Sequence, residues 1–162
     1  MTPIDWAKRP LQKYADFNGR APRAEYWWYT LAIIVVAIVI SIIESILGLG
    51  QTVGPYGLLS LLFMVALIVP GLAVTVRRLH DTNRSGWWIL VAVIPYAILG
   101  FMAGGAVASG DMTGMGTAGL FGIVALVGAI VLLVFMVLPG NKGDNRFGPD
   151  PYAGGAASAA TA

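Results

Sequence analysis

Long apolar stretches alternate with short polar segments along this chain. Four stretches of about 20 residues or more carry almost no charge, namely 27–49, 57–76, 87–106 and 118–138. At a rise of ~1.5 Å per residue, about 20 helical residues cross the ~30 Å hydrocarbon layer of a bilayer. The pattern therefore predicts an all-α integral membrane protein with four transmembrane helices.

The placement of basic residues predicts the orientation of these helices. All ten Lys and Arg residues lie in three segments: the N-terminal segment, the connection between the second and third stretches, and the C-terminal segment. Four crossings place these three segments on one side of the membrane. Because Lys and Arg are retained on the cytoplasmic side during insertion, we expect both termini in the cytoplasm.

The same pattern divides the chain into three parts. Residues 1–26 form a cytoplasmic, interfacial arm, residues 27–138 the membrane domain, and residues 139–162 a cytoplasmic tail that we expect to be disordered after about residue 152. The arm is either a short helix in the headgroup region, broken near Pro10, or a partly ordered basic segment. Small residues recur at helical spacing in the first and fourth stretches, which predicts close helix approach and a compact bundle. These residues are Ala37, Ser41, Ser45 and Gly48 in the first stretch, and Ala118, Gly122, Ala125 and Ala129 in the fourth.

Composition narrows the functional classes. With 57% hydrophobic residues among 162, the chain has no segment long enough for a separate soluble domain. Cysteine is absent, which excludes disulfides and thiolate metal sites. The net charge of +2 follows from the predicted topology, so it does not indicate nucleic-acid binding. We predict no cofactor.

Three polar motifs flank the predicted helices on the cytoplasmic side, at 17–27, 77–88 and 140–151. The second contains Arg-Leu-His-Asp followed by Ser-Gly-Trp-Trp, and the third contains Asn-Arg-Phe-Gly-Pro-Asp-Pro. From Trp6 to Pro151 the chain resembles the domain-of-unknown-function 805 family. The resemblance implies a multi-pass protein of the bacterial inner (plasma) membrane, and it implies no established activity.

Arginine side chains with two carboxylates dominate the candidate site on this face. One interpretation is ion pairing that joins the N-terminal arm to the middle loop. The other is recognition of anionic lipid headgroups, since guanidinium groups bind phosphate bidentately, or of a protein partner or second copy of the chain. The predicted cluster consists of Arg20, Arg23, Glu25, Arg77, Arg78, His80, Asp81, Arg84, Ser85, Asn145 and Arg146.

The cluster also contains the residue types of two chemical sites. His80 is the single imidazole of the chain and precedes Asp81, but a metal site would need further carboxylates from other segments. Ser85, His80 and Asp81 are the residue types of a catalytic relay. Ser85, however, precedes a predicted helix start, where a hydroxyl caps backbone N–H groups. We therefore predict a non-enzymatic protein without a metal.

Glu44 is the one ionisable residue within a predicted span. A carboxylate inside the membrane is costly and is a functional candidate by default. It either reaches water at the outer surface or serves as the ion or proton site of a small transporter or channel. The first alternative fits the leading hypothesis, a membrane protein that binds lipid headgroups or a partner at its cytoplasmic face.

Overall fold

Helices make up nearly all of the ordered secondary structure in the computed structural model, which describes residues 1–50, 56–109 and 115–153. Four helical segments are long and apolar enough to cross a membrane, which confirms the four predicted helices. Each begins or ends within a few residues of its predicted bounds. The elements are α1 (Pro3–Gln12), α2 (Arg23–Ile46), α3 (Leu58–Asp81), the 3₁₀ helix η1 (Gly86–Ile89), α4 (Leu90–Ser109) and α5 (Met115–Val137).

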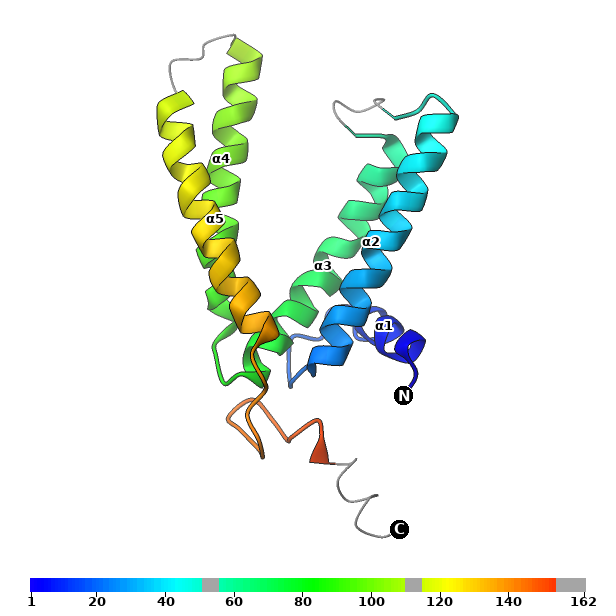
Figure 1. The fold of residues 1–162 in the computed structure, drawn as a ribbon, viewed down its shortest axis with the longest axis vertical. Helices are drawn as coiled ribbons and strands as arrows, with labels where there is room; N and C mark the ends of the chain where they lie inside the picture. The colour runs from blue at the N-terminus through cyan, green and yellow to red at the C-terminus, as the bar shows by residue number, and fades with distance from the viewer. Residues whose placement is uncertain (51–55, 110–114, 154–162) are drawn as a thin grey trace.

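The four long helices form two hairpins arranged as a V (Figure 1). The α2–α3 hairpin and the α4–α5 hairpin meet at one end and diverge toward the other. The end where they meet, residues 1–26, 77–88 and 138–153, is called the polar end below. It holds α1, the α3–α4 connection and the segment after α5 (Figure 1). The predicted compact bundle is therefore wrong.

Small residues explain the difference, because they pack within one hairpin and not between the two. A Cβ added at Gly128 of α5 would lie 2.4 Å from the carbonyl oxygen of Val91, so α4 and α5 touch at the backbone. Ala125, one turn away, is buried. On α2, by contrast, the predicted small face at Ala37, Ser41 and Ser45 is exposed. Lipid gives apolar helices no hydrophobic reason to associate, so the hairpins diverge.

The N-terminal arm contains a short helix, which one of the two alternatives predicted, and this helix does not break at Pro10. Helix α1 starts with a capping box in which Thr2 and Asp5 exchange hydrogen bonds between side chain and backbone. Pro10 lies in the last turn, where its missing N–H costs only one intrahelical bond. Helix α1 packs against α2.

Helix α3 runs five residues past the predicted span and ends at Asp81. Asn83 takes a left-handed conformation with φ 57°. The amide of Asn83 donates to the carbonyl of His80 at 2.9 Å, and that of Arg84 donates to Leu79 at 2.9 Å. This Schellman arrangement terminates the helix. Arg77, predicted to lie in a loop, therefore lies in the last two turns of a helix, as does the rest of the Arg-Arg-Leu-His-Asp run.

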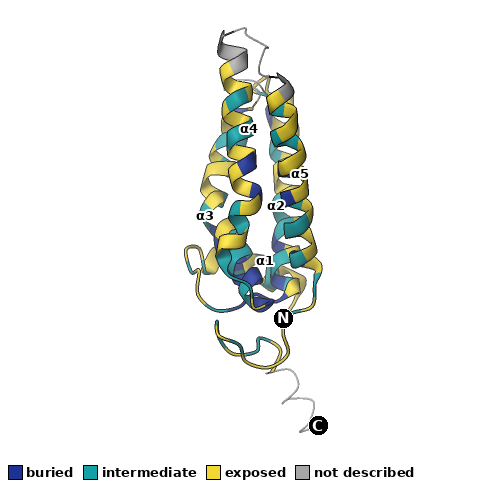
Figure 2. Cartoon of the chain, turned by 90° about the vertical axis from the view of Figure 1, so that its left-hand side faces the viewer, coloured by how far each residue is buried: buried dark blue, intermediate teal, exposed yellow. Residues whose placement is uncertain are grey.

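Buried residues gather at the polar end (Figure 2). Glu25, Arg77, Arg78 and Asp81 are all 0% exposed. A small apolar cluster, which includes Tyr29, adjoins them. Away from this end the long helices mostly expose apolar side chains, as expected of surfaces that face lipid. The interior of this protein is thus centred on charged groups.

Candidate functional site: a buried arginine cluster

Asp81 is the centre of the polar end, where it pairs with two arginines. Arg20 Nε and Nη2 each lie 3.0 Å from Asp81 Oδ1, and Arg78 Nη1 donates to Oδ2. All three side chains are at most 1% exposed. Arg20 precedes α2, whereas Arg78 and Asp81 lie one turn apart on α3. The triad therefore fixes the N-terminal segment onto α3.

Arg78 also connects α3 to the other hairpin. Its Nε donates to the carbonyl of Met136 at 3.2 Å, and its Nη2 donates to the carbonyl of Leu138. These carbonyls lie at the C-terminus of α5, where the last carbonyls of a helix lack intrahelical donors and carry partial negative charge. One guanidinium thus completes the end of α5 while it remains paired with Asp81.

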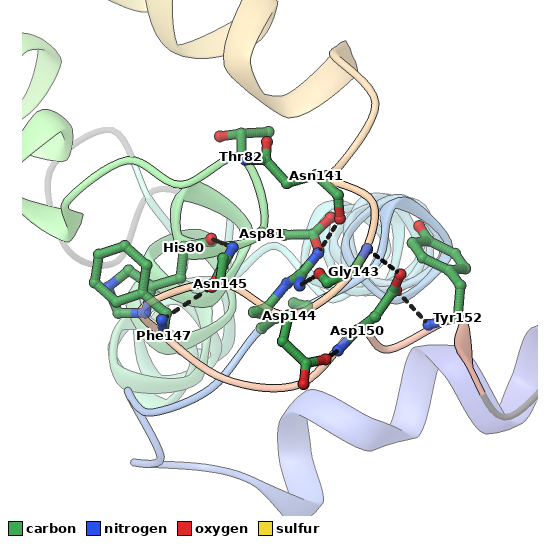
Figure 3. A network of polar contacts seen from close by, with 12 residues as sticks. His80, Asp81, Thr82, Asn141, Gly143, Asp144, Asn145, Phe147, Asp150 and Tyr152 are labelled. Carbon is green, nitrogen blue, oxygen red and sulfur yellow. Dashed lines mark hydrogen bonds and ion pairs between the residues drawn. The ribbon is translucent and has the colours of Figure 1, made fainter.

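The segment after α5 folds over the same triad (Figure 3). Arg20 donates to the carbonyls of Asn141 and Gly143, and the amide of Asn141 donates to the carbonyl of Asp81 at 2.8 Å. A Cβ added at Gly140 would lie 2.1 Å from Asp81 Oδ2, so this position requires glycine. The third motif therefore packs against the end of α3.

A second buried pair lies between α2 and α3. Arg77 Nη1 lies 2.6 Å from Glu25 Oε1, and both side chains are 0% exposed. Arg9 Nε of α1 approaches Glu25 Oε2 at 3.4 Å. The amide of Ala21 donates to the carbonyl of Arg77 at 3.0 Å. Glu25 therefore links three helices, and the backbone contact keeps Arg20 next to the end of α3.

His80, Asp81 and Ser85 have separate partners and do not form a relay. His80 Nδ1 lies 3.2 Å from the carbonyl oxygen of Gly19, and the ring stacks on Phe147 with centroids 3.9 Å apart. The Ser85 hydroxyl accepts from the amide of Trp87 at 3.4 Å, so its predicted capping role is confirmed. Among the described residues, no three His, Asp or Glu side chains are grouped so as to hold a metal ion.

The other predicted basic residues lie outside this interior. Arg84 is half-buried, with its guanidinium 4.1 Å from the ring centroid of Phe135. Arg23 and Arg146 are exposed. Each makes one long side-chain bond to a carbonyl, that of Arg23 to Val137 at 3.4 Å and that of Arg146 to Asn83 at 3.3 Å. The arginines and carboxylates of the predicted cluster therefore divide into two sets. The interior set is Arg20, Glu25, Arg77, Arg78 and Asp81, and the surface set is Arg23, Arg84 and Arg146.

The tail is shaped by short contacts around Asp150 (Figure 3). Its carboxylate accepts from the amide of Gly143 at 2.8 Å and from the amide of Tyr152 at 2.9 Å. These backbone N–H groups, with that of Tyr152 contributing most, stabilise the charged form and lower the pKa of Asp150 below 3.8. Asn145 adds a link to α3, because its Nδ2 donates to the carbonyl of His80 at 2.9 Å.

Glu44 does not reach outward as the leading hypothesis expected. It is 2% exposed, and its carboxylate accepts from the amide of Ser60 at 3.0 Å and from the Ser60 hydroxyl. Ser60 is the third residue of α3, where free backbone N–H groups favour a negative charge. A Cβ at Gly57 would lie 2.1 Å from the carboxylate. Glu44 therefore caps α3 from the neighbouring helix.

Sequence reasoning missed several residues that complete the site. Gly140 and Phe147 lie in the third motif, from which only Asn145 and Arg146 were predicted as part of the cluster. Met136 and Leu138 contribute backbone carbonyls, so their side chains do not indicate this contact in the sequence. Ser60 carries a weak one, since a hydroxyl near the start of α3 faces an acidic residue in the preceding helix.

Comparisons with known proteins agree with the sequence resemblance. The family described as "Protein of unknown function (DUF805)" matches residues 14–149. "Inner membrane protein YhaI" of Escherichia coli K12 is 36% identical over 151 residues, 93% of this chain and 98% of that protein. "Inner membrane protein YhaH" of the same strain is 33% identical over 148 residues, 91% of this chain and 97% of that protein. No solved structure matches the chain.

Proposed function

The chain belongs to the DUF805 family of inner membrane proteins, and we propose that it is a non-enzymatic member whose polar end binds anionic lipid headgroups at the cytoplasmic face. The polar end contains ten basic and six acidic residues. The interior set pairs three of the basic residues, Arg20, Arg77 and Arg78, with two of the acidic residues, Glu25 and Asp81. Among the remaining residues of the polar end, the basic ones outnumber the acidic ones.

The observation that carries this proposal is the separation of buried ion pairs from exposed cations. Lys8, Arg23, Lys142 and Arg146 are exposed, while Arg77 and Arg78 are 0% exposed and paired. Arg77 and Arg78, both predicted for headgroup binding, therefore act inside the fold. Their pairing joins the three segments of the polar end, which carry the exposed basic residues.

Tryptophan residues support the placement of this surface at the membrane interface. Trp27, Trp28, Trp87 and Trp88 are between 38% and 77% exposed, and all lie at the polar end or at its border with the long helices. Indole rings prefer the headgroup level. Anionic lipids are enriched in the cytoplasmic leaflet and attract basic residues there by about 1 kcal/mol each.

Reporter fusions test the orientation. The one-sided distribution of Lys and Arg predicts that fusions after Arg84 and Tyr152 report the cytoplasm. Fusions near Gly54 and Asp111, in connections that lie outside the described residues, should report the periplasm. A cytoplasmic signal at Asp111 would refute the combination of this orientation with four full crossings.

Nanodiscs of defined composition test the headgroup preference. Replacing phosphatidylcholine by phosphatidylglycerol should raise the Tm of the protein, and Lys142→Gln with Arg146→Gln should reduce that rise. Asp144→Asn is the matched control, since it removes an exposed negative charge from the same tail and should preserve or enlarge the rise. An equal Tm in both lipids would refute headgroup binding and favour a protein partner for this surface.

The alternative, a small transporter or channel with Glu44 as its ion site, has less structural support. The carboxylate of Glu44 is engaged as a helix cap, and such a cap stabilises the hairpin without any transported ion. The liposome experiment described in the Discussion separates the two hypotheses.

A further inference from the structure

We infer that the α2–α3 hairpin binds one acyl chain of an anionic phospholipid in a groove between its helices, with the lipid phosphate at Arg23. This inference rests on the proposed headgroup preference of the polar end and adds a defined position for the lipid. Four observations carry it: the dimensions of the groove, the chemistry of its walls, the direction in which it opens and the charge at its mouth.

The groove has a volume of about 630 Å³ and is lined by α2, α3 and Tyr56, which precedes α3. Its lining extends from Tyr26 to Ala37 on α2 and from Thr75 back to Ser60 on α3. At ~1.5 Å per residue these segments are about 16 and 22 Å long. One leaflet of a bilayer contributes about half of the ~30 Å hydrocarbon layer, so the groove accommodates an acyl chain of one leaflet.

The walls of the groove present hydrocarbon to their contents. Most of the lining residues are apolar, including Ile33, Phe63 and Leu67. The Thr30 hydroxyl donates to the carbonyl of Tyr26 at 2.8 Å, and the Thr75 hydroxyl donates to that of Gly71 at 2.7 Å. Both threonines thus direct their hydroxyl hydrogens into their own helices. Such a surface suits a lipid chain better than a hydrated solute.

The groove opens toward the other hairpin, inside the V. Arg23 lies three residues before Tyr26 and seven before Thr30, so it continues the groove-lining stripe of α2. Arg78 continues the stripe of α3 in the same way, three residues after Thr75. Arg23 and Arg78 both donate to carbonyls at the end of α5. The two stripes therefore face α5, on the side where the hairpins diverge (Figure 1).

Charge at the mouth of the groove selects an anionic lipid. Arg78 is paired with Asp81 and is fully buried, which leaves Arg23 as the exposed guanidinium on these two stripes within the described residues. Its one side-chain bond, to Val137, is long at 3.4 Å, and a guanidinium has five N–H donors. The adjacent Trp27 and Trp28 mark the headgroup level. A phosphate at Arg23 places its acyl chain at the entrance beside Tyr26.

Photocrosslinking tests this assignment. The protein would be reconstituted in phosphatidylcholine vesicles that contain a small fraction of phosphatidylglycerol with a photoactivatable group midway along one acyl chain. Adducts should concentrate on the groove residues of α2 and α3 and should be weaker with the equivalent phosphatidylcholine probe. Adducts spread evenly over all four long helices would overturn the inference.

Two variants with a matched control locate the effect. A Cβ at Gly71, which lines the groove, meets no atom within 4 Å, so Gly71→Leu places its side chain in the open space of the groove. Displacing about two methylenes of the lipid should lower adduct yield about tenfold. Gly100 on α4 is equally open and does not line the groove, so Gly100→Leu should leave the yield unchanged. Equal yields for both variants would overturn the assignment of the groove.

Arg23→Gln tests the headgroup contact separately. It should reduce the yield with the phosphatidylglycerol probe about fivefold, as expected for one basic residue near an anionic surface, and leave the phosphatidylcholine probe unaffected. Groove adducts that form equally with both probes in the unmodified protein would refute the anionic preference. Adducts that depend on phosphatidylglycerol but lie outside the groove would refute the groove and leave the proposed function standing.

Discussion

The two hairpins are held together by different means. In α2–α3 the contacts that join the helices most strongly lie near their ends, with Glu25–Arg77 at the polar end and Glu44–Ser60 at the other. In α4–α5 the contact lies along the helices, where Gly128 meets the backbone at Val91. Just before α4, Trp88 of η1 meets the ring of Phe135 of α5 edge-on, with the ring centroids 5.3 Å apart. Within the described residues, α4 and α5 contain no charged side chain.

This difference accounts for the groove in the α2–α3 hairpin. Polar contacts at both ends hold α2 and α3 at a distance set by side chains, so the space between them is not filled. A glycine in α5 lets the backbones of α4 and α5 approach closely. Apolar burial gives no net gain in lipid, so each hairpin is held by another interaction. Polar contacts hold α2 and α3, and close backbone packing holds α4 and α5.

Asp81 joins the two hairpins, and its loss should have the largest effect on stability. Asp81→Ala leaves Arg20 and Arg78 buried without a counter-charge, which costs about 3–5 kcal/mol. Unfolding of the detergent-solubilised protein measures this loss. Asp5→Ala is the control, because Asp5 is exposed at the start of α1 and its loss should cause only local fraying. Equal stability of Asp81→Ala and the unmodified protein would mean that the charges serve insertion alone.

Gly128 tests packing by shape in the α4–α5 hairpin. Gly128→Leu forces α4 and α5 apart, because even a Cβ would lie 2.4 Å from the carbonyl oxygen of Val91. Overpacking of this kind costs about 1–3 kcal/mol, measured by the same unfolding experiment. Gly100→Leu, at an open position of α4, should unfold like the unmodified protein. A stable Gly128→Leu variant would show that the hairpin does not depend on close backbone contact.

Glu44 tests the hydrogen bonds between Glu44 and Ser60, which join α2 and α3 at the end of the hairpin away from the polar end. Glu44→Ala should lower the Tm by less than Asp81→Ala does, and Glu44→Gln by still less, because the amide oxygen still accepts from Ser60. Both variants should leave lipid vesicles as tight to protons as the unmodified protein does. If the unmodified protein conducts protons or cations and Glu44→Gln abolishes that flux, the transporter hypothesis replaces the proposed one.

Asp150 should give the smallest effect, confined to the tail. Its pKa is lowered below 3.8 by the amides of Tyr152 and Gly143. A lowered folded-state pKa stabilises the tail above pH 3.8, and this contribution is lost as the pH falls through the folded value. The amide NMR signal of Gly143 should titrate in that range. The same titration in Asp150→Asn would show that the carboxylate is not responsible.

Much of the fold could be predicted from the order of residues alone. Four helices follow from the length of the apolar stretches, since the chain must satisfy its backbone groups internally in lipid. The composition of the second motif correctly identified Ser85 as a cap. The residues of the candidate cluster also meet at one end of the molecule, as an even number of crossings requires. These properties depend on local sequence and on the solvent, so a single chain reveals them.

The sequence did not predict which arginines would be buried. Arg23 and Arg78 have the same side chain and lie at the same end, yet one is exposed and the other is enclosed. What separates them is the neighbourhood of Arg78, where Asp81 lies one turn away and the distant segment after α5 adds Gly140 and the carbonyls of Met136 and Leu138, whereas Arg23 has one long contact to Val137. Burial of a charge is favourable only where such partners converge, and convergence depends on the path of the whole chain.

The sequence by itself thus determined that this protein crosses a membrane, how many long helices it has and which polar segments share one end. The tertiary structure decided that the hairpins diverge, that Glu44 caps a helix and that the arginines divide into an interior and a surface set. The physical reason is that hydrophobicity and length act residue by residue. Hydrogen bonds and ion pairs need particular atoms within about 3 Å of each other, and only the folded chain brings them there.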